Sequence, residues 1–543
     1  MATKKVSKPE KPTRIYHNLR LATILILVPI IVGVLVLQYV LGGPFIQHLA
    51  SRGSDRLITA NWETAYDQLS AAQPDYETKF AYYRLKAGQD LDWVARHFSV
   101  NISKLRELNP GLAVYKTTVA IPPVEKPLEP FQETSGNSKN LIIKETEDML
   151  YVSNDFRKPL VNTTIPELTQ LLAKQGAITQ LGDKHFRINK PITIEDNIRL
   201  DITKKTVSKL ELSSSSDFAI TCLCFENAEV LIKDTTITSI DPATNKPDID
   251  SNNGRSFVRG LESSRMDIIN SDISYLGNGL LEGRQQKAIL RDGGTYGTSL
   301  RISDDRLGQD IATGWVEAST FSRNHFGGFT FGASGMTWRN NLFTKNDVYG
   351  LDPHDDSNNA TIENNRFIAN GKHGFIVSKR CNYNVIRNNI SAGNGGHGYM
   401  LHEDSNYNVI ENNVAIGNTD NFAIYASSFN TVRGNKSYNP RSAHVRVNAD
   451  TTQSFVQNNL FYGGEKGVYL YEQADSVLIE GNIFAGISGD ILVTRQASRV
   501  LFTGNQIDAL HYRISDGDRV VFGPNQVQDK PAVDLRPLNE YYY

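Results

Sequence analysis

The strongest pattern in this chain is a repeat of short apolar segments, rich in β-branched residues and each set around an asparagine. The asparagines recur every 22 to 24 residues, at Asn341, Asn365, Asn389, Asn413, Asn435, Asn459, Asn482 and Asn505. A short and constant period of this kind is typical of a solenoid, in which each repeat packs on its neighbours. No repeat contains an apolar pattern of helix length. The pattern therefore predicts an all-β fold, a parallel β-helix, and a right-handed one because parallel crossovers almost always have that hand.

The repeated asparagines need no catalytic explanation. Asparagine tolerates the left-handed backbone of tight turns, and its side-chain amide can stack on the amide of the next coil. Turn chemistry already accounts for asparagine at such positions. We therefore do not expect these residues to take part in a reaction.

The repeats also predict which side chains face outward. Shifts of 22 or 24 residues superpose the segments 328–332, 350–354, 374–378 and 398–402. Because side chains alternate along a strand, Asp352 and His354 should share the outer face. His402 falls in the same outer column two coils on, at roughly 9–10 Å by strand spacing. The two columns that are apolar throughout, and are expected to point into the coil, are Phe329/Leu351/Phe375/Tyr399 and Phe331/Pro353/Val377/Leu401.

One repeat contains more potentially reactive side chains than its neighbours. Within 348–355, a tyrosine, two carboxylates and an imidazole stand close together, at Tyr349, Asp352, Asp355 and His354. A lone exposed histidine is usually only solvated, but a neighbouring carboxylate holds the tautomer of the ring and raises its basicity. This stretch is therefore the candidate active site.

Basic residues cluster one coil further on. Lys372, Lys379 and Arg380 lie within nine residues that contain no acid, and the last two stack under Asp355 and Asp356. A plain salt bridge between coils is one interpretation, and such a pair contributes little at a surface. The other is a carboxylate-binding site beside the histidine, which we favour because a guanidinium suits a uronate carboxylate.

The N-terminus predicts a location. A basic segment at 1–20 precedes an uncharged apolar run at 21–41, which at about 1.5 Å per residue spans roughly 30 Å, the thickness of a bilayer core. Residues 1–20 should stay in the cytoplasm while the rest is exported. A cleaved signal peptide would have a shorter apolar segment, so we expect a retained anchor, a polar juxtamembrane segment at 42–78 and a periplasmic protein tethered to the inner membrane.

A small separate module is expected at 79–124. Its pattern predicts strand, helix, helix, strand, with Asp90 capping the first helix and Ser103 the second. This stretch resembles a LysM module, which binds glycans containing N-acetylglucosamine, such as peptidoglycan; a small spacer without a ligand is the alternative. Prolines mark a linker at 125–140.

The main domain is expected at 141–525, followed by a C-terminal tail at 526–543. Near its start, Thr164 and Pro166 predict the beginning of a short amphipathic helix that Gly176 ends. A helix at this position covers the first coil of a stacked β structure.

Charge and cysteine content add little. A formal net charge of −2 gives no sign of a nucleic acid partner. Cys222 and Cys224 are two residues apart, where a disulfide would be strained, and Cys381 stands alone, so all three are expected to be bystander thiols. The spacing of the cysteines fits no metal site.

The β-helix region resembles the mannuronan C5-epimerases of alginate-producing bacteria, especially their periplasmic enzymes. The resemblance covers most of the β-helix and rests on the motifs at 275–277, 294–297, 307–309, 313–315, 349–355 and 373–378. It implies that His354 is the base that removes the C5 proton, that Asp352 and Asp355 orient it, and that Tyr349 lies near the sugar ring.

The resemblance leaves one role open. The family's carboxylate-neutralising arginine directly follows a Val-Ser pair, and Lys379 occupies that place here with Arg380 next. Strand parity favours Arg380, whereas the motif alignment favours Lys379. The catalytic residues expected are His354, Asp352, Tyr349 and Arg380, and the substrate-binding residues expected are Asp355, Lys379, Lys372, His373 and His402.

The expected function is C5 epimerisation of mannuronate to guluronate residues in an anionic polysaccharide. A polysaccharide lyase uses the same carbanion and is the first alternative, and a non-catalytic glycan-binding protein is the second. No calcium-binding nonapeptide repeat and no cofactor fingerprint is present, so neither a metal nor a cofactor is expected. A polysaccharide-secretion complex is a further expected partner.

Overall fold

The computed structural model describes residues 61–71, 73, 81–86, 89–110, 118–130, 141–155, 160–214, 221–252, 254–279, 296–303, 307, 310–509, 511–528 and 533–541. The predicted cytoplasmic tail at 1–20 and membrane helix at 21–41 lie outside these residues. Within the described part of the chain, no helix is long and apolar enough to cross a membrane.

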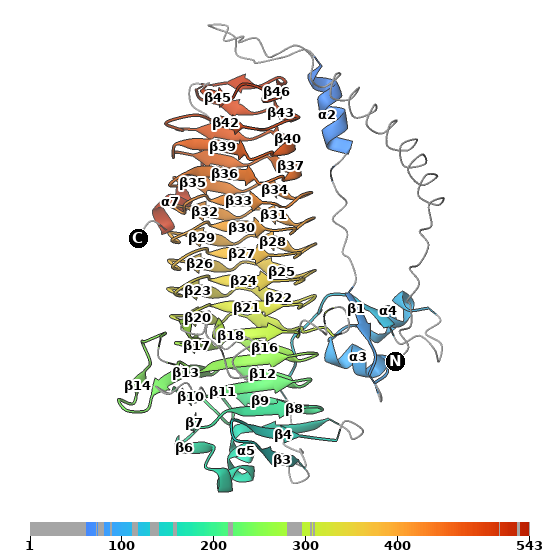
Figure 1. Ribbon diagram of the computed structural model, residues 1–543, viewed down its shortest axis with the longest axis vertical. Coiled ribbons are helices and arrows are strands. Elements are labelled where there is room, and N and C mark those ends of the chain that lie inside the picture. The colour runs from blue at the N-terminus through green and yellow to red at the C-terminus, as the bar shows by residue number, and fades with distance from the viewer. Residues whose placement is uncertain are drawn as a thin grey trace, which may run out of the picture.

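The main body is a parallel β-helix with three long sheets, as the repeat predicts (Figure 1). Each coil adds one strand to each sheet. In spatial order, sheet C contains β3 (Ile142–Glu145), β4 (Leu150–Ser153), β8 (Ile192–Glu195), β11 (Cys222–Glu226), β15 (Phe257–Leu261), β18 (Thr298–Arg301), β21 (Gly328–Phe331), β24 (Leu351–His354), β27 (Phe375–Ser378), β30 (Tyr399–His402), β33 (Phe422–Tyr425), β36 (Ala443–Asn448), β39 (Lys466–Tyr471), β42 (Leu492–Arg495) and β45 (Tyr512–Ile514).

The other two sheets follow the same coils. Sheet D contains β5 (Val161–Thr164), β9 (Ile198–Thr203), β12 (Glu229–Lys233), β16 (Arg265–Ile269), β19 (Trp315–Glu317), β22 (Thr337–Arg339), β25 (Thr361–Glu363), β28 (Val385–Arg387), β31 (Val409–Glu411), β34 (Thr431–Arg433), β37 (Thr452–Gln457), β40 (Asp475–Glu480), β43 (Val500–Thr503) and β46 (Val520–Phe522). Sheet A contains β6 (Ile178–Gly182), β7 (His185–Ile188), β10 (Lys209–Ser213), β13 (Thr236–Asp241), β17 (Asp272–Ser274), β20 (Thr320–Ser322), β23 (Leu342–Thr344), β26 (Arg366–Ile368), β29 (Ile390–Ala392), β32 (Val414–Ile416), β35 (Lys436–Tyr438), β38 (Leu460–Tyr462), β41 (Ile483–Ala485), β44 (Gln506–Ile507) and β47 (Gln526–Val527), with β14 (Lys246–Pro247) beside β13.

Stacked side chains fill the inside of the coil. Phe321, Phe343 and Phe367 follow one another in successive coils, with ring centroids 4.9 and 5.2 Å apart. All three side chains are fully buried and belong to one continuous core that runs the length of the β-helix. Identical residues therefore stack on one another in successive coils. This stacking requires a nearly constant repeat length along the chain.

The repeated asparagines form the expected amide ladder. The two roles predicted for asparagine, stacking its amide and adopting a left-handed backbone, belong to two neighbouring residues. The second asparagine of each pair is buried and bonds its counterpart in the next coil; Asn389 Nδ2 donates to Asn413 Oδ1 at 3.0 Å. The first asparagine takes the left-handed backbone, as at Asn388 with φ 56°. Gly434, Gly481 and Gly504 replace that first asparagine in three later coils, also at positive φ.

The capping helix forms where it was predicted. Helix α5 (Ile165–Leu171) has Thr164 as its N-cap in a capping box with Glu167 and a proline in its first turn. Ile165 and Leu168 are fully buried in the main core. The chain then leaves the helical region through a left-handed residue, Gly176, with φ 60°.

The N-terminal module has the predicted order of elements. Strand β1 (Ala81–Arg84) pairs antiparallel with β2 (Thr118–Ile121) in sheet B, and helices α3 (Leu91–His97) and α4 (Ile102–Leu108) lie between them in the chain. Asp90 caps α3 as predicted. The prediction that Ser103 caps α4 was wrong, because Asn101 stands one residue before the helix and its side chain accepts from the first-turn amides.

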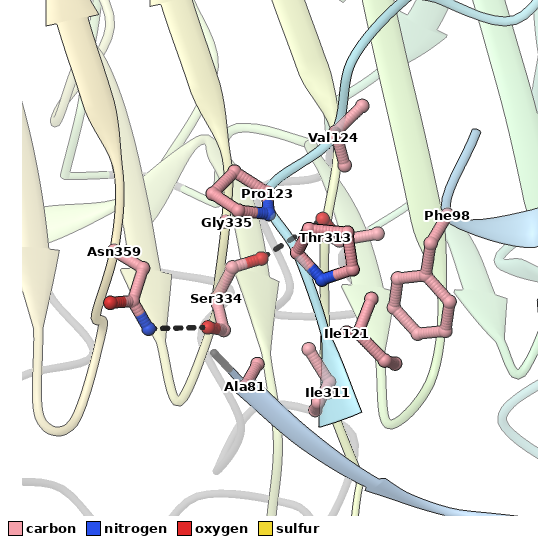
Figure 2. A pocket seen from close by; sticks show the side chains of 11 residues that line it. Ala81, Phe98, Ile121, Pro123, Val124, Ile311, Thr313, Ser334, Gly335 and Asn359 are labelled. Atoms are coloured by element: carbon pink, nitrogen blue, oxygen red, sulfur yellow. Dashed lines mark hydrogen bonds between the residues drawn. The ribbon is translucent and has the colours of Figure 1, made fainter. Parts of the chain in front are cut away.

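Buried polar contacts dock the module onto sheet D. Arg265 is fully buried and donates to the carbonyl oxygen of His97 at 2.6 Å and to that of Lys126 at 3.0 Å. His97 Nδ1 lies 3.1 Å from Glu229 Oε1. The first part of the predicted linker therefore lies along the β-helix. Figure 2 shows the contact between the N-terminal module and the β-helix near Pro123. A cavity of about 10 Å³ there leaves room for no more than a water molecule.

Two further helices lie against the outside of the β-helix (Figure 1). Helix α2 (Trp62–Ala71), inside the segment expected to be only polar, packs Ala65 and Leu69 against β37, β40 and β43. Helix α7 (Arg536–Tyr541), in the C-terminal tail, lies beside β32 in sheet A. The β-helix itself ends with β47, just beyond the predicted boundary at 525.

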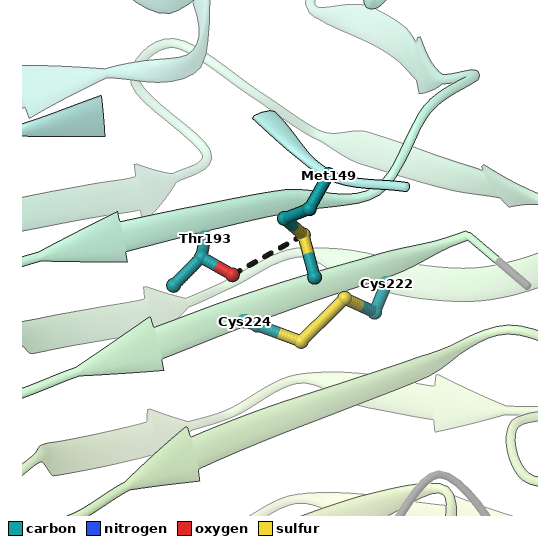
Figure 3. Close-up of a disulfide and its surroundings, with 4 residues drawn as sticks. All are labelled: Met149, Thr193, Cys222 and Cys224. Atoms are coloured by element: carbon teal, nitrogen blue, oxygen red, sulfur yellow. Dashed lines mark hydrogen bonds between the residues drawn. A yellow bond between two sulfur atoms is a disulfide. The ribbon is translucent and has the colours of Figure 1, made fainter. Parts of the chain in front are cut away.

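The prediction for two of the cysteines was wrong. Cys222 and Cys224 form a disulfide with their Cα atoms 5.7 Å apart, next to Met149 and Thr193 (Figure 3). Both side chains point to the outer face of β11, and this Cα separation lies within the ordinary range for disulfides. Cys381 is a buried free thiol, as expected.

Candidate active site

Strand β24 presents Asp352 and His354 on the outer face of sheet C. Leu351 is fully buried in the main core, so the alternation of a strand places Asp352 and His354 outside. His354 pairs with Ser378 on β27, which pairs with His402 on β30. The predicted outer column of His354 and His402 is therefore present.

The predicted register one coil earlier was wrong. Phe329 lies opposite Asp352 and Phe331 opposite His354, so both aromatic side chains face outward and not into the coil. Gly328 stands opposite Leu351 instead. The ring of Phe329 lies 5.5 Å from that of His354, between centroids, and Phe329 is therefore an aromatic neighbour of the site that the repeat alignment missed.

Asp355, and not Asp352, bonds the histidine. The Nδ1 atom of His354 lies 2.5 Å from Asp355 Oδ2. Because a carboxylate only accepts, Nδ1 carries the proton and Nε2 is left with its lone pair. No residue in the described ranges bonds Nε2. Burial lowers the pKa of His354 despite the Asp355 carboxylate, which acts to raise it, so the ring is held in its neutral form.

Arg380 fixes the other side of Asp355. Its guanidinium donates to Asp355 Oδ1 at 2.8 Å and to Asp356 Oδ2 at 2.9 Å. Strand parity does not carry as far as Arg380, because β27 ends at Ser378 and two left-handed residues follow, with φ 64° at Lys379 and 60° at Arg380. The predicted salt bridge between coils therefore forms, and Arg380 makes it with Asp355 and Asp356.

Lys379 follows Ser378, the residue that pairs with His354 in the next coil. Its charge acts to lower the pKa values of Asp352, His354 and His402. The side chain is half-buried, and its ammonium makes no ion pair with the residues that the structure describes. This position gives a carboxylate-bearing ligand a cation beside His354.

Asp352 is a buried acid. Its side chain is 2% exposed, and its Oδ1 atom bonds no described residue. Burial and the nearby Asp355 carboxylate raise the pKa of Asp352 well above its usual value, against smaller opposing effects of Ser378 and Lys379. The protonated form of this carboxyl group therefore persists to unusually high pH.

A row of stacked rings borders the site. The ring of Tyr349 lies 5.0 Å from that of His373, which lies 4.8 Å from that of His397. The ammonium of Lys372 lies 6.0 Å from the Tyr349 ring centroid. Burial, with smaller effects of His397 and other neighbouring charges, lowers the pKa of His373 to about 3, so this imidazole is neutral.

The nine predicted site residues thus gather along one face, at the ends of β24, β27 and β30. Three further side chains on this face were not predicted, namely His397, Asp420 and Arg446. His397 stacks on His373, and the Arg446 guanidinium lies 3.3 Å from Asp420 and 3.1 Å from His397. Among the described residues, no group of His, Cys, Asp and Glu side chains could hold a metal ion.

Larger cavities lie elsewhere and do not serve this site. A cavity of about 240 Å³ separates Leu69 of α2 from Val521 of sheet D, and one of about 290 Å³ lies near Thr203 and Lys233 at the N-terminal end of sheet D. Among the described residues, the His354 side chain is 24% exposed on the outer face of sheet C.

Comparison with known proteins agrees with the predicted hand of the coil. The chain matches the model of the right handed beta helix region over residues 256–415 and 376–515. It is similar to the crystal structure of the periplasmic alginate epimerase AlgG, at 18% identity over 88% of this chain and 99% of that chain, with a TM-score of 0.54. A double mutant of AlgG is similar at 19% identity over 69% of this chain and 85% of that chain, also with a TM-score of 0.54. At such identities the likeness shows the fold. No curated protein matches the chain.

Proposed function

We propose that this protein is a C5-epimerase that converts mannuronate to guluronate residues within a polyuronate such as alginate. One observation carries the proposal: Asp355 bonds Nδ1 of His354 and leaves Nε2 unprotonated, and Lys379 directly follows Ser378, the residue that pairs with His354 in the next coil. The solved structure of similar fold, AlgG, is an alginate epimerase, which supports the same substrate class.

The residues fit the chemistry of the reaction. The C5 proton of a uronate is weakly acidic, and its removal places a second negative charge on the carboxylate oxygens. His354 removes the proton through Nε2, while Asp355 holds the ring in the required tautomer. The Lys379 ammonium neutralises the carboxylate, and protonated Asp352 donates a hydrogen bond to it. Reprotonation on the opposite face of the ring, from Tyr349 or a held water, inverts C5.

Arg380 then has a positioning role. Its guanidinium donates to Asp355 and Asp356, and the proposal assigns it this positioning contact and not the substrate carboxylate. It holds Asp355 in place, and Asp355 in turn holds His354. We therefore propose Lys379 as the cation that meets the substrate carboxylate.

A polysaccharide lyase is the second candidate, because the same carbanion can expel the C4 substituent. Incubating the protein with polymannuronate in deuterium oxide separates the two reactions. An epimerase incorporates deuterium at C5 and raises the guluronate signal in the proton NMR spectrum without forming unsaturated ends. Ultraviolet absorbance from unsaturated uronates would select the lyase, and the absence of both signals would exclude both reactions.

The proposed substrate fits a cell-envelope location. Retention at the inner membrane by residues 21–41, and glycan binding by the LysM-like module, remain predictions that belong to this proposal. Membrane fractionation of the full chain tests the first prediction, and a peptidoglycan pull-down tests the second.

A further inference from the structure

Arg446 is a charged side chain on the outer face of sheet C to which the proposed reaction gives no role. It lies on β36, in the outer column that contains Asp352 and continues through Ile376 on β27. Strand pairing takes the column from Ile376 to Met400, from Met400 to Ala423, and from Ala423 to Arg446. Four strand spacings separate Asp352 from Arg446, which is about 19 Å.

Arg446 is held in one orientation. Its Nη1 atom lies 3.3 Å from Asp420 Oδ2, and its Nη2 atom lies 3.1 Å from His397 Nε2. Asp420 is 1% exposed and also accepts from the backbone N–H of Ala443 at 3.1 Å. The Arg446 side chain is 17% exposed, and its Nε atom is buried and bonds no described residue. The guanidinium is therefore preorganised, and Nη1 and Nη2 each keep a second N–H group for a ligand.

The face between Asp352 and Arg446 has no charge in this column. Ile376, Met400 and Ala423 form a small apolar cluster there. Rings stand on both sides of it: the His373–His397 stack on one side, and His402 stacked on Tyr425 at 4.9 Å on the other. Apolar groups and ring edges suit the C–H faces and hydroxyl groups of sugars. Because Ile376, Met400 and Ala423 are buried, the rings beside them form the neutral surface that a sugar would meet between the two ends.

We propose that Arg446 binds the carboxylate of a second uronate residue in the same polymer molecule. A 1,4-linked pyranose ring is comparable in length to one strand spacing, so the bound residue stands about four rings from the reacting sugar. This contact aligns the polymer with the axis of the β-helix and directs it toward the C-terminal coils. The inference rests on the proposed function and adds the direction and minimum length of the substrate.

Calorimetric binding of oligomannuronates of increasing length tests the proposal without requiring turnover. In the wild-type protein, affinity rises by about tenfold or more once an oligomer is long enough to reach Arg446. Arg446→Met removes this step. Arg433→Met keeps it, because Arg433 pairs with Glu411 on sheet D and loses an equal charge from a different face.

A ligand-side variant covers the case in which Arg446→Met does not fold. An oligomer whose distal carboxylate has been reduced to an alcohol should bind the wild-type protein as weakly as a short oligomer. A smooth rise of affinity with length, or a step that survives in Arg446→Met, overturns the proposal.

The two proposals fail in different ways. A protein that shows the affinity step but no deuterium uptake at C5 retains the Arg446 site and loses the epimerase function. A protein that exchanges C5 hydrogen in all oligomers, with no affinity step, retains the function and loses the site.

Discussion

At the scale of single residues, the state of His354 decides the activity. Burial lowers its pKa below the ordinary value of about 6.5, so the neutral base persists into mildly acidic solution. The rate falls only as pH drops through that lowered pKa, since the ring is then protonated. We expect the acid limb of kcat/KM for C5 deuterium exchange to have its midpoint below pH 6.5. A midpoint at or above that value contradicts the assignment of His354 as the base.

The bond between Asp355 and His354 makes a second prediction. Asp355→Asn should lower kcat by roughly 100-fold or more, because an amide can donate to Nδ1 and leave the proton on Nε2, the wrong tautomer for a base. Asp356→Asn is the matched control, since Asp356 shares Arg380 as a partner but lies off the ring. Equal losses in the two variants would mean that only the salt bridge matters.

At the scale of elements, the amide ladder should account for much of the stability of each coil. Asn389→Ala removes an amide that accepts from the backbone N–H of Asn365 and donates to Asn413 and to the Ile362 carbonyl. Leaving such groups buried and unpaired costs about 1–3 kcal/mol each, so we expect a loss of at least about 2 kcal/mol in denaturant unfolding.

The neighbouring residue is the control for the ladder. Asn388 is exposed at φ 56°, so Asn388→Gly should change the free energy of unfolding by less than about 0.5 kcal/mol. A similar loss from both substitutions would show that the turn, and not the ladder, carries the stability.

The period of the repeat was sufficient to predict the β-helix, the ladder and the outer position of His354. It failed at Phe329, because the strand-to-strand distance before β24 is not the 22 residues that were assumed. Aligning Gly327 with Gly350 would have placed Phe326 beside Tyr349, whose rings are 5.2 Å apart, and would have turned Phe329 outward.

Other features left no signal in a single sequence. Arg446 is one arginine among many, and only the stacking of four coils brings it into the column of Asp352. The side chain of Arg380 was assigned by strand parity, but two left-handed residues break that parity, and left-handed backbone at Lys379 and Arg380 is not predicted by residue type.

At the scale of the whole molecule, the module at 81–124 should be a fixed part of the body. Arg265→Met removes the donor to His97 and Lys126 and leaves Asp267 buried without its cation. We expect a loss of roughly 3–5 kcal/mol and faster hydrogen exchange in β1, α3 and β2. Arg106→Met, on the exposed side of α4, should leave exchange unchanged. Unaltered exchange in Arg265→Met would show that the buried contacts do not hold the module.

The path of the C-terminal tail has a consequence for how the stack comes apart. A column of coils with only neighbour contacts frays from its ends, one layer at a time. Here the chain leaves β47 at the terminal coil and doubles back, so that Asp534 bonds Lys436 at 2.8 Å and Leu538 packs near Ile416, several layers inward. The C-terminal tail thereby attaches the last coils to the middle of the β-helix. The last coils should therefore unfold together with the middle coils and not before them.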